Sequence, residues 1–332
     1  MKKPILCVIF GGKSSEYEVS LRSAYGIITH IDREKYDLVC LGITKTGEWY
    51  IFEGEHKEIE NGTWESGNIL PVTFDLTNGN LIVFDKGIYV ISVDLFLPIL
   101  HGEYGEDGRI QSLLDIAGVK YLGCGPFSSH ICMDKALAKA VAQKSGIEVA
   151  RVFEQGDEIS YPVFVKPTMR GSSVGVSLVE KATDLAKAVL EAKKYGDVMV
   201  EERIFGNEVE VGILEKGDSL IVSEVGMVKH GGVFYDYDTK YKCEKNQYLI
   251  PAPFDKKVLE GVKEHAKALF RLLGCKDLSR FDFFIKKNKD VVFNEVNTMP
   301  GFTEKSLFPR LFAGLGLSFC DVVDIMVENV LC

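Results

Sequence analysis

The chain has 332 residues, of which 46% are hydrophobic and 26% charged, so it can form two or three domains with full hydrophobic cores. This balance excludes a disordered chain and a small disulfide scaffold. Asp and Glu (48) outnumber Lys and Arg (39), and the net charge of −9 argues against nucleic acid or an anionic membrane as the main partner.

The first third of the chain has the pattern of a strand, a glycine turn and a helix. An apolar run over 5–10 meets two glycines, and periodic apolar residues predict a helix over 18–31. Apolar runs over 38–43 and 93–100 and a periodic segment over 108–117 complete a predicted parallel α/β domain. Both of the longest apolar runs, 5–10 and 93–100, are far shorter than the roughly 20 residues of a membrane helix, so we expect a cytoplasmic protein without a membrane partner.

The rest of the chain alternates helices and strands. We predict a helix over 133–145, capped by Ser128 or Ser129, a strand over 162–167 and a helix over 183–195. Beyond these we predict strands at 198–201, 208–214, 220–228 and 281–285 and helices at 256–273 and 319–331. The predicted fold is α/β, with three domains around a shared cleft: 1–123, 124–200 and 201–332.

Three patterns that suggest familiar binding sites fail on spacing. A P-loop needs a glycine where Cys7 stands before Gly12-Lys13, so we reject that motif. Gly123-Cys124-Gly125 has Ser128 in place of the third glycine of a dinucleotide site, which leaves a nicotinamide cofactor weakly supported. The eight cysteines contain no Cys-x-x-Cys pair, and we expect reduced packing residues instead of a zinc site or disulfides.

The loop over 169–175 has the composition of a phosphate-binding loop. Its glycines and the hydroxyls of Ser172 and Ser173 would let backbone and side-chain donors approach a phosphate closely. Such a loop alone is more often an ordinary hairpin turn. Lys166 just before it and Lys135 in the preceding helix supply charges that bind phosphate oxygens, although two lysines could also be surface residues.

The strongest polar cluster, Asp282, Glu295 and Asn297, follows Arg280 and is interleaved with apolar residues. Carboxylates between buried strands are costly unless they are paired, and a hard cation would explain them. Oxygen ligands suit Mg²⁺, and Asn297 points to the same side of a strand as Glu295. The sequence therefore favours a magnesium site over a pair of solvent-facing carboxylates.

Six motifs, in order along essentially the whole chain, resemble those of the D-alanine–D-alanine ligases of the ATP-grasp superfamily. They are Gly-Gly-Lys-Ser-Ser-Glu-Tyr-Glu-Val-Ser from Gly11, Leu-His-Gly-Glu-Tyr-Gly-Glu-Asp-Gly from Leu100, Met-Asp-Lys from Met133, Val-Lys-Pro and Gly-Ser-Ser-Val-Gly from Val165, Phe-Tyr-Asp-Tyr-Asp-Thr-Lys-Tyr from Phe234 and Asn-Glu-Val-Asn-Thr-Met-Pro-Gly-Phe-Thr from Asn294. The resemblance implies a three-domain ATP-grasp fold that clasps ATP between two sheets, and we expect a homodimer.

The resemblance also implies which residues bind the nucleotide and the metal. The expected phosphate ligands are Lys135, Lys166, Ser173 and Lys240, the last at the γ-phosphate. The adenine edge and the ribose are expected to contact Glu201, Arg203, Ile204 and Glu208. Two Mg²⁺ or Mn²⁺ ions are expected on Asp282, Glu295 and Asn297.

The amino-acid sites follow from the same resemblance. Glu16 is expected to orient the first ammonium, together with Ser172 and Tyr241. His101 resembles the first-subsite histidine, and the oxyanion hole and the second subsite correspond to Arg280, Gly301, Ser306 and Leu307. For His101 a satisfied loop histidine, and for Ser306 a helix N-cap, remain open alternatives.

The implied activity is ATP-dependent ligation of two D-alanines through an acyl phosphate, which supplies D-Ala-D-Ala for peptidoglycan precursors. D-Serine or D-lactate as the second substrate is the alternative within the family. Tyr235, Tyr237, Tyr241 and Leu307 follow the D-alanine pattern. A non-catalytic nucleotide-binding module would lack a metal carboxylate or the γ-phosphate lysine, and the sequence has both.

Overall fold

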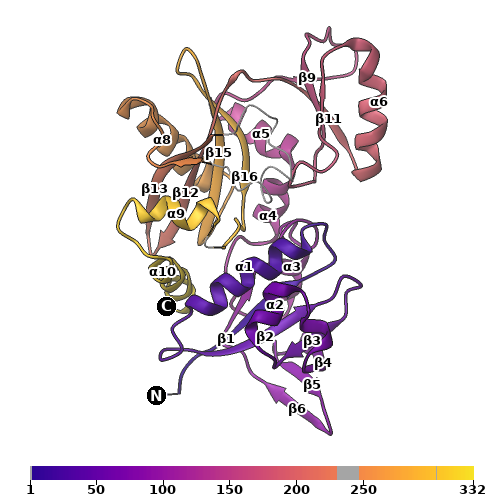
Figure 1. The fold of residues 1–332 in the computed structure, drawn as a ribbon, viewed down its shortest axis with the longest axis vertical. Coiled ribbons are helices and arrows are strands. Elements are labelled where there is room, and N and C mark those ends of the chain that lie inside the picture. The colour runs from indigo at the N-terminus through magenta and orange to yellow at the C-terminus, as the bar shows by residue number, and fades with distance from the viewer. Residues whose placement is uncertain (1, 230–246, 304) are drawn as a thin grey trace.

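The computed structural model describes residues 2–229, 247–303 and 305–332 of the chain. These residues form three separate sheets, which Figure 1 shows with the N-terminal sheet at the bottom and the central one at the upper right. No helix among them is long and apolar enough to cross a membrane. The predicted domain limits at residues 123 and 200 stay a prediction.

The N-terminal sheet has seven strands in the order β6-β5-β4-β3-β2-β1-β7. Its strands are β1 (Ile5–Gly11), β2 (Asp37–Ile43), β3 (Trp49–Phe52), β4 (Ile69–Phe74), β5 (Leu81–Phe84), β6 (Ile88–Ile91) and β7 (Leu95–Pro98). The helices of this part are α1 (Tyr17–His30), α2 (His56–Asn61), η1 (Trp64–Ser66) and α3 (Arg109–Ile116).

The predicted parallel arrangement applies to only three of these seven strands. β1 pairs in parallel with β2 and β7. From β2 to β6 every neighbouring pair is antiparallel. β1, β2 and β7 are the runs from which the sequence predicted a parallel domain. The connections from β2 to β3, from β4 to β5 and from β5 to β6 are shorter than the crossover of a dozen or more residues that a parallel partner needs. β3 and β4 are joined by a longer segment that contains α2 and η1 and are antiparallel nevertheless.

The central sheet has the order β10-β9-β11-β8 and is antiparallel throughout. It comprises β8 (Val152–Phe153), β9 (Val163–Pro167), β10 (Ser177–Val179) and β11 (Val198–Glu202). α6 (Ala182–Ala192), followed by η2 (Lys193–Tyr195), packs its apolar face on this sheet. The apolar stripe of a short helix thereby covers one face of a small sheet.

The predicted helix over 133–145 is confirmed as α5 (Lys135–Lys144), and a separate helix, α4 (Pro126–Met133), precedes it. The cap of α5 is Asp134, whose carboxylate accepts the N–H groups of Ala136 and Leu137. Ser128 and Ser129 do not cap it, because both lie inside α4, which begins with a proline at its first position. An extended backbone at Asp134 separates the two helices.

The C-terminal sheet is antiparallel in the order β14-β13-β12-β15-β16. Its strands are β12 (Gly206–Lys216), β13 (Ser219–Lys229), β14 (Gln247–Leu249), β15 (Leu278–Lys286) and β16 (Val291–Asn297). The helices are α8 (Lys256–Leu272), α9 (Leu307–Ala313) and α10 (Phe319–Leu331). α8 belongs to one apolar cluster with this sheet, whereas α9 and α10 contribute to a second.

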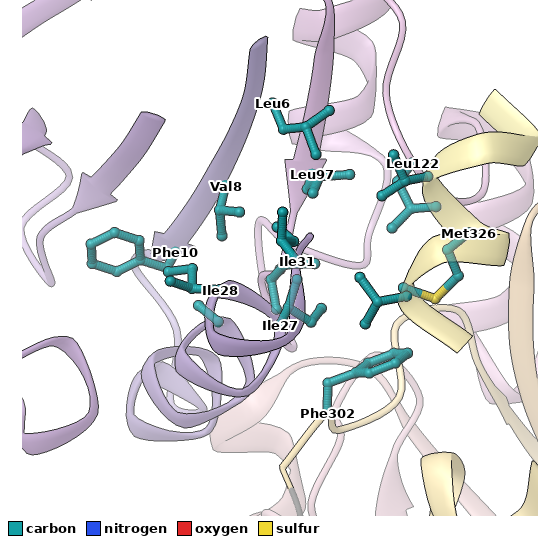
Figure 2. Packing of buried hydrophobic residues seen from close by; sticks show 14 of the residues in the cluster. Leu6, Val8, Phe10, Ile27, Ile28, Ile31, Leu97, Leu122, Phe302 and Met326 are labelled. Carbon is teal, nitrogen blue, oxygen red and sulfur yellow. The ribbon is translucent and has the colours of Figure 1, made fainter. Parts of the chain in front are cut away.

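The second of these clusters joins the two ends of the chain. It contains Val8 of β1 and Ile27 of α1 together with Phe302 and Met326 of the C-terminal part, as Figure 2 shows. A Cβ atom at Gly26 of α1 would overlap the carbonyl oxygen of Phe302. The N-terminal helix is therefore held against the loop that follows β16.

We predict that Gly26→Ala destabilises the protein by about 1–3 kcal/mol, because the new methyl group has no room beside Phe302. Helix propensity alone would favour alanine by about 0.5–1 kcal/mol. Gly261→Ala in α8 is the control, since a Cβ there meets nothing within 4 Å, and it should stabilise. Urea unfolding measures both changes, and equal stabilisation by both variants would contradict the close packing.

Candidate active site

A pocket lies where the N-terminal sheet, the loop after β9 and the end of β16 meet. Eight of the residues that the sequence singled out line it: Glu16, His101, Lys135, Ser172, Arg280, Glu295, Asn297 and Gly301. They come from the start of α1, the loop after β7, the start of α5, the loop after β9, the strands β15 and β16 and the loop after β16. The pocket therefore exists only when distant segments of the chain pack together.

Glu16 is held at the start of α1, between two loops. Its carboxylate accepts a hydrogen bond from the Ser172 hydroxyl, as the sequence predicted. A Cβ at Gly102 or Gly171 would lie 2.6 or 2.7 Å from Glu16 Oε2, so a side chain at either position would displace the Glu16 carboxylate. Tyr241, the expected third member of this set, lies outside the described residues.

Glu106 also lines the pocket, although the sequence analysis did not single it out. Its two carboxylate oxygens accept the backbone N–H groups of Gly102 (2.8 Å) and Met299 (3.1 Å). Burial, and then the charge of nearby Glu16, raise the pKa of Glu106 to about 8. A second acid within the motif from Leu100 was the signal that could have revealed it. Two neighbouring carboxyl groups make this part of the pocket suited to a cation.

The buried His101 side chain forms a hydrogen bond and lines the pocket beside these acids. Its Nε2 lies 2.9 Å from the Ser23 hydroxyl, which also accepts the N–H of Phe302. Burial lowers the pKa of His101 to about 4, so the ring is neutral near pH 7. His101 therefore has the hydrogen-bond partner within the protein that the structural alternative required. It also lines the pocket, where a substrate could contact it.

Arg280 is the buried partner of Asp282. Its Nε and Nη2 donate to the two Asp282 oxygens at 2.8 and 2.7 Å, and Glu210 Oε2 lies 2.9 Å from Nε. Burial opposes the charge, but Asp282 and Glu210 outweigh it and raise the pKa of Arg280. The sequence predicted a metal as the reason for the buried Asp282 carboxylate, and in the structure a guanidinium pairs this carboxylate. Glu210 was missed because it lies on another strand, β12.

The three predicted metal ligands nevertheless lie close together. Asp282 and Glu295 are register partners across β15 and β16, and Asn297 Nδ2 donates to Asp282 Oδ2 at 3.2 Å. Glu295 Oε2 is 3.2 Å from Lys135 Nζ. In the described part of the chain, no group of three or more His, Cys, Asp or Glu residues is arranged for a metal. Two carboxylates and an amide still fit a hard cation.

The predicted phosphate lysines are bound to different partners. Lys135 Nζ donates to the carbonyl of Arg170 at 2.7 Å, at the start of the serine loop. Lys166 pairs with Glu201 Oε1, and Lys139 Nζ lies 3.0 Å from Glu201 Oε2. Burial opposes ionisation of Glu201, but the two lysines outweigh it and lower its pKa. Both oxygens of Glu201 thus face lysines, and Lys139 was missed by the sequence analysis.

The serine loop itself has an unusual backbone. Ser172 and Ser173 have φ angles of 50° and 58°, in the left-handed region that costs about 1–2 kcal/mol per residue. Arg170 in the same loop pairs with Glu103, next to the Gly102 that contacts Glu16. The loop after β9 is therefore tied to the N-terminal part of the pocket.

Other predicted residues lie outside this pocket. Arg203, Ile204 and Glu208 are partly exposed around the connection from β11 to β12. Ser306 occupies the N-cap position of α9, but its hydroxyl accepts the N–H of Thr303 (3.0 Å) and makes no cap bond. Leu307 is buried in a small cluster with Val228 and Leu311. Lys240, Tyr235 and Tyr237 lie outside the described residues.

Two family models together match most of the chain. "D-ala D-ala ligase N-terminus" matches residues 5–124 and "D-ala D-ala ligase C-terminus" residues 136–328. The chain is 38% identical to D-alanine–D-alanine ligase B of Clostridium tetani, over 99% of this chain and 94% of that protein. It is 41% identical to a putative D-alanine–D-lactate ligase of Streptomyces coelicolor, over 96% and 94%.

A solved structure shares the whole arrangement. The VanG D-Ala:D-Ser ligase from Enterococcus faecalis superimposes with a TM-score of 0.88 at 36% identity, over 99% of this chain and 100% of that one. These similarities agree with the predicted family and with the ATP-grasp fold. The chain therefore belongs to the D-alanine–D-alanine ligase family, whose members are ATP-dependent, ADP-forming ligases that serve peptidoglycan precursor synthesis.

Proposed function

We propose that this ligase joins two D-alanines into D-Ala-D-Ala through an acyl phosphate. The observation that supports a D-amino acid in the first subsite is the pair of acids, Glu16 and Glu106, beside neutral His101. An ammonium group between the two carboxyl groups relieves their repulsion. Glu16 then orients the first D-alanine, and Ser172 holds the Glu16 carboxylate in place.

The carboxylate of this first substrate attacks the γ-phosphate, and the amine of the second then displaces phosphate. We assign the oxyanion hole for that second step to Arg280 and the N–H of Gly301, both in the pocket wall. The bonds from Arg280 to Asp282 use Nε and Nη2, not Nη1, whose protons suit a developing oxyanion. Ser306, with Leu307 beside it, is our candidate for binding the second carboxylate.

ATP would bind with its phosphates toward the lysines. We assign the phosphates to Lys135, Lys166, Ser173 and Lys240 and the adenosine to Glu208 and the backbone at Arg203 and Ile204. We also assign the adenine edge to Glu201, whose carboxylate lies between two lysines. Two Mg²⁺ or Mn²⁺ ions on Asp282, Glu295 and Asn297 would neutralise phosphate charge. We also propose a cytoplasmic homodimer.

The second candidate activity uses D-serine as the second substrate. The similarity to the VanG D-Ala:D-Ser ligase supports this activity. The 41% identical relative named for D-lactate supports a third possible product, the depsipeptide D-Ala-D-Lac. The buried, apolar Leu307 favours D-alanine, because it presents no charged or hydroxyl group at that position. Product analysis distinguishes the three.

With D-alanine alone, the phosphate released reports the formation of D-Ala-D-Ala. We predict that this release exceeds the additional release caused by D-serine or D-lactate when either is supplied as the second substrate. Dipeptide formation should rise from about pH 6 toward pH 9, because the second amine must lose its proton before it attacks. Chromatography of the products identifies each one. Equal yields of dipeptide and D-Ala-D-Lac by the unmodified enzyme at pH 6 would overturn D-alanine as the preferred second substrate.

We predict that Glu295→Gln nearly abolishes ATP turnover, because it removes one of the two carboxylates proposed to bind the metal. The melting temperature should change little, since Glu295 is partly exposed and a glutamine has the same shape. Glu260→Gln, at an exposed position of α8, is the control and should retain full turnover. An active Glu295→Gln enzyme would contradict the metal assignment.

His101 predicts a stability change at acid pH. The unfolded chain protonates this histidine below about pH 6.5, but the folded protein does so only near pH 4, so folding stability is lost as the pH falls between them. The loss attributable to His101 is about 3 kcal/mol at about 1.4 kcal/mol per pKa unit. Urea titrations of the protein and of His101→Gln at several pH values isolate it, and parallel curves would disprove the assignment.

A further inference from the structure

Lys139 is a buried lysine outside the pocket. It lies on α5, four residues after Lys135, and its side chain is only 3% exposed. Its Nζ lies 3.0 Å from Glu201 Oε2, and Lys166 approaches the other oxygen of the same carboxylate. Within the described residues, Glu201 is the one ion partner of Lys139, and its Nζ makes no hydrogen bond of good geometry.

Burying such a lysine destabilises the folded state. Burial lowers the pKa of Lys139, and the attraction of Glu201 only partly opposes this, since nearby Lys166 adds repulsion. An apolar side chain of similar length would fill the same place without losing hydration. The stability of the fold therefore does not explain why a charged residue occupies position 139, and the charge has another role.

The charges of the three side chains indicate this role. Lys139 and Lys166 with Glu201 carry a net charge of +1, and without Lys139 the remaining ion pair would be neutral. When the Lys166 ammonium turns from Glu201 to a phosphate, a carboxylate buried alone would oppose the movement. With Lys139 present, Glu201 keeps a cationic partner throughout.

We propose that Lys139 is a positioning residue for the nucleotide: it keeps Glu201 paired and so leaves Lys166 available to the phosphates of ATP. This inference rests on the proposed role of Lys166. Lys139 itself touches neither ATP nor the amino acids and acts through Glu201.

The test compares ATP affinity by titration calorimetry and the KM values of the full-length enzyme. Lys139→Met should raise the Kd and the KM for ATP about tenfold or more and leave the KM for the first D-alanine unchanged. Lys144→Met, at an exposed position of the same helix, is the matched control and should bind ATP normally. Lys139→Arg keeps the charge and should stay within about threefold of the unmodified enzyme.

The comparison of Lys139→Met with Lys139→Arg is the decisive measurement. A merely structural role for Lys139 predicts similar changes in the KM values for ATP and for D-alanine, so a Lys139→Met enzyme in which both values rise together would overturn the proposal. Should Lys139→Met fail to fold, a folded Lys139→Arg with a tenfold loss of affinity would overturn it as well.

The same experiment separates this inference from the proposed function. Normal ATP binding by Lys139→Met would overturn the inference alone, because the unmodified enzyme would bind ATP as proposed. An unmodified chain that binds no ATP would overturn both the proposed nucleotide site and the role of Lys139.

Discussion

Buried charge has to be paired, and this requirement governs the structure around the active site. Arg280 lies between Asp282 and Glu210, and Glu201 lies between Lys139 and Lys166. Removing one partner from such a group leaves an uncompensated charge in a medium of low polarity, which is strongly destabilising. The strands and the helix that carry these side chains therefore cannot shift independently, and this makes the pocket beside them rigid.

Glu16 and Glu106 are two acids that lie close together in the pocket. Their carboxylates accept hydrogen bonds from neutral donors, the Ser172 hydroxyl and two backbone N–H groups, and the pKa of Glu106 is raised. Hydrogen bonds stabilise the acids but leave their mutual repulsion in place. We propose that this pair of acids binds the ammonium group of the first D-amino acid.

The pocket also depends on a core shared by the two ends of the chain. Ser23 of α1 bonds both His101 and the N–H of Phe302, and Phe302 belongs to the same apolar cluster as β1 and α10. The backbone N–H of Gly301, which we assign to the oxyanion hole, lies directly before that anchor. Packing between the N-terminal and C-terminal parts of the chain thereby positions the Gly301 N–H.

The sequence by itself determined the elements whose pattern is local and the motifs that mark the family. The apolar runs and helical periods placed β1, β12, β15, α8 and α10, and the motifs identified Glu16, Ser172 and Arg280. Only the tertiary structure decided what those residues contact. Asp134 caps α5 in place of the expected serines, the Arg280 guanidinium pairs Asp282, Glu106 lines the pocket, and Lys139 contacts Glu201. Glu106 bonds Met299 from 193 residues away, and no periodicity along the chain encodes such a contact, because burial and pairing of charge are properties of the packed whole.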